Sequence, residues 1–402
     1  MGMLRQCIDW LGSGEKTPPD LVALCLQRIA EREPELRAWV EVSPQEPLGH
    51  GALDGIPFAA KDTFETRGLP TEFGSPIYAG RKGATDAALV VQLRRLGAIL
   101  LGKTQTTVFA SFDPSPTRNP HNPAHTPGGS SSGSAAAVAA GMAAFSIGSQ
   151  TQGSIGRPAS YCGVAGFKPT YGLLSTEGLF PFAPTLDTPG LFTQNAADMR
   201  LLWSRMGFPT AASAPSICAV PDSLDAEPEM EAAFRQTADG LKAAGFRVDT
   251  IPFPGWAELT AASRLVNQYE GARTHEQVWR QHGAALGAKL AQLISDGLRL
   301  SESQYRDALA VIGEMKRKMD AVFREYPVVL TPAAPGPAPR GLESTGDPRM
   351  NSAWTALGTP AISVPMACAK GLPLGLQMAA RNGDDALLLD FAVSASRAGV
   401  LK

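Results

Sequence analysis

Cysteine and histidine are scarce in this chain of 402 residues, and their pattern removes several classes of protein. The five cysteines are widely spaced without a CxxC pair, and the five histidines form no HExxH motif. An odd, scattered set of cysteines favours neither a disulfide framework nor a zinc site, so we expect small buried side chains. His121 and His125 lie in a turn rich in proline and asparagine, where a loop role is favoured over a metal pair. Neither a metal nor any other cofactor is expected.

A strong charge of one sign is absent as well. Lys and Arg total 36 against 38 Asp and Glu, for a formal net charge of -2, and no long run of one sign occurs. A nucleic-acid groove or a site for an anionic membrane needs a basic patch, so neither partner is expected. The apolar run at residues 135–145 is too short to span a bilayer, and the first residues lack the pattern of a secretion signal. The expected location is the cytoplasm.

Glycine and proline, by contrast, are abundant. The 41 glycines and 33 prolines, with 44% hydrophobic residues, predict a large core and many tight connections. In the first half of the chain, helical and strand patterns alternate, which predicts an α/β layer architecture. The expected helices cover residues 17–34, 86–96 and 134–144, and the expected strands cover 53–60, 98–101 and 145–148.

The second half has a more helical pattern. Helices are expected at residues 227–244, 256–282, 301–324 and 384–397, and strands at 327–330, 361–365 and 374–379. The proline-rich segment 331–351 is expected to form a lid or a pocket wall, because long irregular segments in compact chains usually carry function. No repeat or linker divides the chain. Residues 1–402 are therefore interpreted as one domain, with about 225–325 as a candidate helical subdomain.

The first of two serine-rich loops, residues 126–134, leads into an alanine-rich run. Residues 129–133 match G-x-S-x-G, the nucleophile elbow of α/β-hydrolases. That interpretation requires an acid and then a histidine in a loop, whereas His275 and His282 lie on an expected long helix. A phosphate-binding loop is excluded because no Gly-Lys-Ser/Thr closes the glycine run. Taken alone, the loop is best interpreted as a turn that caps a helix.

The second loop, residues 148–158, changes this interpretation. It follows an expected strand, and its small and polar residues can direct several backbone N–H groups to one point, as an oxyanion hole requires. Lys61 ends the apolar segment 56–60. Burial there would lower the pKa of its amine towards neutrality and make it a base. On its own, Lys61 beside Asp62 would be interpreted as a surface pair.

In order and spacing, residues 55–62, 126–142 and 148–172 resemble three segments of the amidase signature family, serine hydrolases that cleave carbon–nitrogen bonds. The similarity extends from about residue 17 to about residue 397, and residues 205–325 are its least diagnostic part. The resemblance implies an α/β fold, a single large α/β/α domain with a central mixed, twisted sheet covered by helices. It also implies catalysis without histidine.

The resemblance further implies a role for each matching residue. Ser154 matches the nucleophile that forms the acyl-enzyme, Ser130 matches the bridging serine on a cis peptide bond, and Lys61 matches the base. Ser131 is expected to support the lysine by hydrogen bonding. The oxyanion hole is expected from the backbone N–H groups of four consecutive residues, Thr151, Gln152, Gly153 and Ser154.

Three positions depart from the family pattern, and the substrate preference is therefore not carried over. Gln150 stands where the family usually has aspartate, Gln152 where it has glycine, and Gly156 where it has arginine. If the aspartate and the arginine pair in relatives, the loss of both leaves no unpaired buried charge. The pocket walls are expected from residues 105–116, the helical half and segment 331–351. Their aromatic side chains belong equally well to the pocket or to the core: Phe109, Phe112, Phe180 and Phe182.

The favoured function is hydrolysis of a small or medium linear amide through a Ser154 acyl-enzyme. Carbamate, urethane or aryl-ester hydrolysis by the same three residues is an alternative. A second alternative is an amidotransferase subunit, and the short chain counts against it. A catalytically silent binding protein is disfavoured because all three catalytic residues are present. The expected partner is a small amide or carbamate substrate, and a homodimer is compatible with the sequence.

Overall fold

The structure is a computed structural model that describes residues 1–211, 213–223, 225–366 and 371–401. Its centre is one mixed sheet of 11 strands in the order β1-β3-β2-β4-β6-β5-β10-β11-β9-β7-β8. The strands are β1 (Trp39–Gln45), β2 (Pro57–Lys61), β3 (Ile99–Thr104), β4 (Phe145–Gln150), β5 (Ala165–Lys168), β6 (Thr188–Thr193), β7 (Ile217–Pro221), β8 (Arg247–Ile251), β9 (Val328–Pro332), β10 (Ala361–Pro365) and β11 (Gly375–Ala380).

Parallel pairing occurs in two places in this sheet. Strand β2 lies parallel to both β3 and β4, and β7 lies parallel to both β8 and β9. The remaining neighbours are antiparallel. Because β2 is flanked by parallel strands, its carboxyl end and that of β4 meet at one edge of the sheet, where side chains from both can come together.

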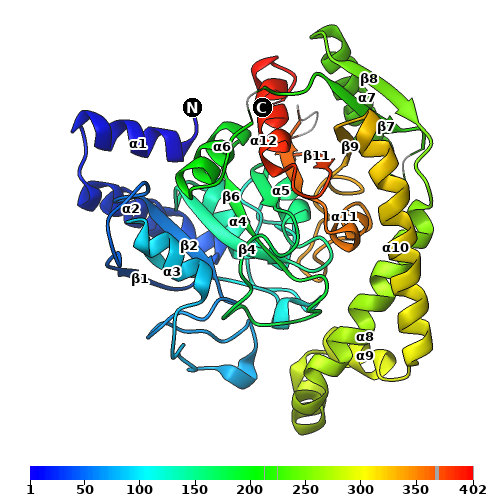
Figure 1. The fold of residues 1–402 in the computed structure, drawn as a ribbon. Helices are drawn as coiled ribbons and strands as arrows, with labels where there is room; N and C mark the ends of the chain where they lie inside the picture. The colour runs from blue at the N-terminus through cyan, green and yellow to red at the C-terminus, as the bar shows by residue number, and fades with distance from the viewer. Residues whose placement is uncertain (212, 224, 367–370, 402) are drawn as a thin grey trace.

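Helices cover the sheet, as Figure 1 shows. They are α1 (Met3–Ser13), α2 (Pro18–Leu36), α3 (Ala88–Arg95), α4 (Ser132–Ala139), α5 (Gly156–Cys162), α6 (Ala196–Arg205), α7 (Pro228–Ala243), α8 (Trp256–His282), α9 (Ala288–Gly297), α10 (Glu302–Glu325), α11 (Ser352–Leu357) and α12 (Asp385–Arg397). The expected α/β/α fold with a mixed central sheet is confirmed.

Local sequence explains where several helices begin and end. Helix α2 starts with a capping box between Thr17 and Asp20, with proline in its first turn. Its expected end at Pro34 is wrong: the helix continues to Leu36 and closes on Arg37, which has a left-handed φ of 51°. The helix expected at 134–144 ends at Ala139, because Gly141 turns the chain with a φ of 68°.

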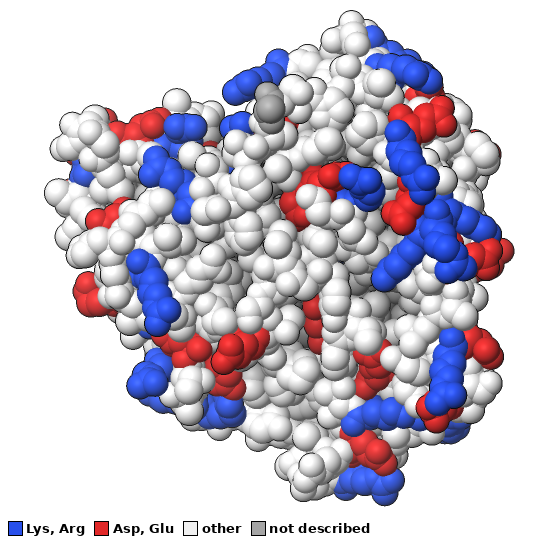
Figure 2. Space-filling model, viewed as in Figure 1, with Lys and Arg blue, Asp and Glu red and all other residues white. Residues whose placement is uncertain are grey.

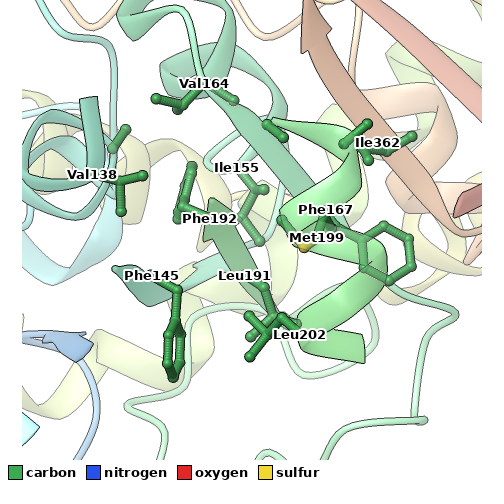
Figure 3. Close-up of a cluster of buried hydrophobic side chains, with 14 of the residues drawn as sticks. Val138, Phe145, Ile155, Val164, Phe167, Leu191, Phe192, Met199, Leu202 and Ile362 are labelled. Carbon is green, nitrogen blue, oxygen red and sulfur yellow. The ribbon is translucent and has the colours of Figure 1, made fainter. Parts of the chain in front are cut away.

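The core forms two hydrophobic clusters, and the larger one includes side chains from both faces of strands such as β2 and β6. Figure 3 shows part of the larger cluster, where Leu191 of β6 lies near Met199 and Leu202 of α6, and Phe192 lies beside Ile155. The smaller cluster joins α8 and α10 to β9 and α11. Four cysteines are buried and free, as expected, namely Cys7, Cys25, Cys162 and Cys218. Cys368 lies outside the described residues.

The candidate subdomain at 225–325 contains two kinds of structure. Helices α8, α9 and α10 pack on one another along one side of the molecule, opposite α1 and α2 (Figure 1). Strand β8 instead extends the common sheet through β7, and helix α7 packs against β8 and β9. Within the described part of the chain, no helix combines the length and apolar character that a membrane crossing demands.

We predict that Gly133→Ala destabilises the protein by about 3 kcal/mol, because overpacked core sites must displace backbone. A Cβ at this position in α4 would lie 2.2 Å from the carbonyl oxygen of Ala38 and 2.5 Å from the backbone nitrogen of Gln105. Urea unfolding measures the change in the free energy of unfolding.

Gly12→Ala is the matched control, because Gly12 lies exposed in helix α1 with nothing within 4 Å of its Cβ position. It should raise stability by up to about 1 kcal/mol through helix propensity. Equal stability of Gly133→Ala and wild type would contradict the close approach of these backbones.

Candidate active site

Lys61 is a completely buried lysine at the carboxyl end of β2. Its Nζ lies 2.7 Å from Oγ of Ser130, 3.0 Å from Oγ of Ser149 and 3.4 Å from the carbonyl oxygen of Ser149. Burial lowers the pKa of Lys61 to about 7, and the charge of Asp187 opposes this shift. The amine is therefore neutral in a large share of molecules at neutral pH, which a general base requires.

Ser130 faces Lys61 from the loop that precedes α4. The peptide bond between Gly129 and Ser130 is cis, as the family resemblance implied. The carbonyl oxygen of Ser130 accepts a hydrogen bond from the backbone N–H of Thr107, and Ser132 Oγ donates to the carbonyl oxygen of Gly128. Both contacts hold the loop so that the hydroxyl of Ser130 points to the amine.

Ser149, which the sequence analysis missed, is the second hydroxyl at the lysine. Ser131 was expected to support the lysine by hydrogen bonding, and its side chain does not bond the amine directly among the described residues. Ser131 Oγ instead donates to the carbonyl oxygen of Ser149 at 3.2 Å and accepts from its backbone N–H at 3.4 Å. Ser131 therefore supports the lysine through Ser149. The available signal was position, because Ser149 is near the carboxyl end of a strand parallel to β2.

The second loop begins with Gln150, whose side chain organises the turn into α5. Its Oε1 accepts hydrogen bonds from the backbone N–H groups of Ile155 and Gly156 at 2.8 and 3.0 Å, and its Nε2 donates to Thr355 Oγ1 at 2.9 Å. Across the described residues, no recorded hydrogen bond uses the backbone N–H groups of residues 151–154. The four groups expected to form the oxyanion hole are therefore available to a ligand.

Asp187 anchors the same loop, and it too escaped the sequence analysis. It accepts a hydrogen bond from Thr151 Oγ1 at 2.6 Å and from the backbone N–H groups of Phe182 and Ala183 at 2.7 and 3.1 Å. Burial raises the pKa of Asp187 to about 6, against the effect of these three hydrogen bonds. Its role was invisible in sequence because Thr151 lies 36 residues away.

Ser154 lines a small cavity of about 20 Å³ together with Ser111, Phe112, Arg157 and Asn267. Among the described residues its hydroxyl forms no hydrogen bond, so the structure joins Lys61 to Ser130 but does not show a hydrogen bond from Ser130 to Ser154. Such contacts often tighten only when substrate is bound. The hydroxyl of Ser154 is thus free to meet a carbonyl carbon.

A larger cavity of about 650 Å³ adjoins the small one, and both are lined by Phe112, Gln152 and Asn267. The side chain of Gln152 reaches out of the loop and donates to Ser263 Oγ of α8 at 3.1 Å. The outer cavity is also lined by residues 335–349. The expected walls from 105–116, the helical half and 331–351 are therefore present.

The expected aromatic residues divide between pocket and core. Phe112 and Phe182 line the small cavity, whereas Phe109 and Phe180 pack against each other with ring centroids 5.0 Å apart. His275 lies among these rings, and burial lowers its pKa to about 4. Among the described residues, no recorded hydrogen bond joins His275 to a serine of either loop. This counts against the interpretation of residues 129–133 as an α/β-hydrolase nucleophile elbow paired with His275.

Comparisons with known proteins agree on one family. The family model described as Amidase matches residues 20–212 and 211–389. A glutamyl-tRNA(Gln) amidotransferase subunit from Chloroflexus aggregans is 31% identical over 452 residues, which cover 94% of this chain and 92% of that protein. The aligned region is longer than this chain, so that relative carries insertions which this chain lacks.

Solved structures are similar over nearly the whole chain. A crystal structure of an amidase superposes with a TM-score of 0.89 and 27% identity over 99% of each chain. A peptide amidase in complex with the competitive inhibitor chymostatin superposes with a TM-score of 0.83 and 26% identity, over 98% of this chain and 97% of that one.

We predict that Ser149→Ala lowers kcat/KM for amide hydrolysis about 10-fold, as expected for the loss of one neutral hydrogen bond at the base. Since Ser149 Oγ accepts from the amine, its loss should also move the rise of the pH profile to lower pH. Ser160→Ala is the control, because Ser160 is a buried serine of α5 whose Oγ has no partner. An unchanged pH profile in Ser149→Ala would contradict this assignment.

Proposed function

Because the chain belongs to the amidase signature family, we propose that it hydrolyses the carbon–nitrogen bond of a small or medium linear amide through an acyl-enzyme on Ser154. The observation that carries this proposal is the 2.7 Å hydrogen bond between buried Lys61 and Ser130, with the pKa of Lys61 lowered to about 7. A lysine with this pKa is often neutral at pH 7 and can accept a proton, whereas an ordinary surface lysine is already protonated.

The reaction begins with a proton relay. Neutral Lys61 takes the proton of Ser130 as Ser130 takes that of Ser154, and Ser154 Oγ attacks the carbonyl carbon. The negative charge that develops on the carbonyl oxygen is stabilised by the free backbone N–H groups of residues 151–154. The relay then reverses and protonates the leaving nitrogen, since an amide anion is a very poor leaving group. Water hydrolyses the acyl-enzyme by the same relay.

A second candidate is the amide-hydrolysing subunit of an amidotransferase. The curated relatives favour it, because glutamyl-tRNA(Gln) amidotransferase subunits align over more than nine-tenths of this chain. In that case the acyl-enzyme on Ser154 would form by the same proton relay, with glutamine as the amide substrate. The insertions that those relatives carry, and this chain lacks, favour a self-sufficient hydrolase instead. Carbamates, urethanes and aryl esters are alternative substrates for the same three residues.

The proposed partner is the small-molecule substrate alone, and the proposed location is the cytoplasm. Figure 2 shows lysine and arginine intermingled with aspartate and glutamate on one face of the molecule, with no large patch of one sign there. This mixture supports the proposal that nucleic acid is not a partner. The homodimer remains a prediction.

We predict that Ser154→Ala abolishes amide hydrolysis while the protein stays folded. The measurement is release of ammonia or amine from primary amides, aryl amides, carbamates and L-glutamine, and of alcohol from matched esters, with circular dichroism as the control for folding. Turnover of glutamine alone would favour the amidotransferase candidate. Unimpaired hydrolysis by Ser154→Ala would refute the nucleophile.

We predict that kcat/KM rises as the pH passes through about 7 and then levels, because Lys61 must be neutral to accept the proton. Lys61→Met, which keeps the length of the side chain without the amine, should lose this rise and at least about 1,000-fold in rate, since base and relay fail together. A pH profile of wild type that is flat from acid to alkaline would exclude a lysine base.

A further inference from the structure

Arg157 is a buried arginine that the mechanism above does not use. It stands three residues after Ser154, in the first turn of α5, and its exposed fraction is only 2%. Its side chain lines the same small cavity as Ser154. The family resemblance drew attention to the missing arginine at position 156 and gave no role to the arginine beside it.

Most of the guanidinium of Arg157 has no partner. One nitrogen, Nη2, donates to the carbonyl oxygen of Gly129 at 2.6 Å and to Thr345 Oγ1 at 3.2 Å. The other two, Nε and Nη1, are buried without a hydrogen bond. No carboxylate of the described residues lies within 4.0 Å, and Asp347, whose charge acts on Arg157, forms an ion pair with Arg349 at 2.9 Å.

An arginine in this state is energetically unfavourable unless an anion joins it. Burial lowers the pKa of Arg157, but a guanidinium starts so high that it stays protonated in proteins. A buried charge without a counter-ion destabilises a fold by several kcal/mol, and unpaired donors add to that. Hydrogen bonds from arginine to a carboxylate are short and strong because both partners are charged.

Two further polar atoms without a partner line the same cavity. They are Oγ of Ser111 and Oδ1 of Asn267, and both are buried. Native structures leave few such atoms unpaired unless water or a ligand meets them. The volume of about 20 Å³ is close to the space of a single water, so a larger ligand must also occupy part of the adjoining cavity of about 650 Å³. Because Ser154 and Arg157 line the same small cavity, a ligand that reaches both side chains must be short.

We propose that Arg157 binds a carboxylate on the acyl part of the substrate, so that the preferred substrates are monoamides of short dicarboxylic acids. The amide carbonyl meets Ser154, and the free carboxylate meets the unused donors of Arg157. This inference deepens the proposed function and rests on amide hydrolysis at Ser154. It adds a substrate class that the catalytic residues alone do not specify.

Arg157 also has a supporting role, because its Nη2 holds the carbonyl oxygen of Gly129 next to the bridging serine. Loss of that contact alone would reduce the turnover of every substrate by a similar factor. A carboxylate site would instead reduce the turnover of anionic substrates selectively. The test must therefore compare substrates that differ only in charge.

The first experiment compares the monoamides of malonic, succinic and glutaric acids with the corresponding neutral diamides. For the best chain length, wild type should show a kcat/KM at least about 10-fold higher for the monoamide, the size of one charged hydrogen bond. Arg157→Gln should abolish this preference, and Arg157→Lys, which keeps the charge, should retain part of it. Arg235→Gln is the control, since Arg235 is an exposed arginine of α7 that lines neither cavity.

Equal or better cleavage of the diamides by wild type would overturn the carboxylate site and leave amide hydrolysis intact. That comparison needs no variant, so it holds even if Arg157→Gln fails to fold. The carboxylate site is also overturned if Arg157→Gln lowers the turnover of monoamides and diamides by the same factor, which would assign Arg157 to support of the loop alone.

The second experiment does not depend on turnover. Calorimetry on Ser154→Ala measures the binding of malonate, succinate and glutarate, and at least one should bind with a Kd of about 1 mM or tighter. Adding Arg157→Gln should weaken that binding about 10-fold or more. No binding of any of the three would overturn the inference. Binding without hydrolysis of any amide would instead overturn the proposed function.

Discussion

The proposed chemistry depends on burying the amine of Lys61 without a carboxylate of the described residues at ion-pair distance. Lys61 lies at the end of β2 between two parallel strands, and within the described part of the chain its amine forms hydrogen bonds only with serine oxygens. A second buried lysine, Lys103 on neighbouring β3, shows the contrast. Lys103 lies 3.4 Å from Asp62 and donates to the carbonyl oxygen of Phe64, so its charge is shared and it acts as a structural cation. Asp62 is therefore a buried partner of Lys103, and the surface pair with Lys61 is excluded.

The same preference for neutral partners shapes the second loop. Gln150 bonds Thr355, and Asn351 bonds Gln377 at 2.8 Å, so amides and hydroxyls occupy the space where the family pattern expects an aspartate and an arginine. A Cβ at Gly156 would lie 2.6 Å from Asn351 Nδ2, so a larger residue there would displace this amide. The departures at 150 and 156 thus belong to one arrangement. Arg157 remains as a charged group that lines the same cavity as Ser154.

Sequence predicted the long, regular elements and the contact between Lys61 and Ser130. The helix at 256–282 and the strand at 361–365 agree in both bounds with α8 and β10, since a long 3.6-residue pattern and flanking prolines are strong local signals. Short buried elements such as β5 and α11 were missed, because every residue in them is buried and no periodicity remains. Ser149, Asp187 and Arg157 were missed for another reason: their roles arise from contacts between distant segments, which no local pattern records.

The two cavities divide the site into a closed side and an open side. The closed side, of about 20 Å³, holds Ser154 and the unpaired donors of Arg157, whereas the open side, of about 650 Å³, begins beyond Gln152 and Phe112. If the carboxylate end of the acyl group lies on the closed side, beside Arg157, the amine must leave through the open one. Selection would then be strict for the acyl group and loose for the amine, because only the closed side surrounds its ligand. Such a division would allow members of one family to differ in substrate, and the relatives found include an amidase, a peptide amidase and an amidotransferase subunit. Their differences would lie in the walls around Ser154, where this chain has placed Gln152 and Arg157.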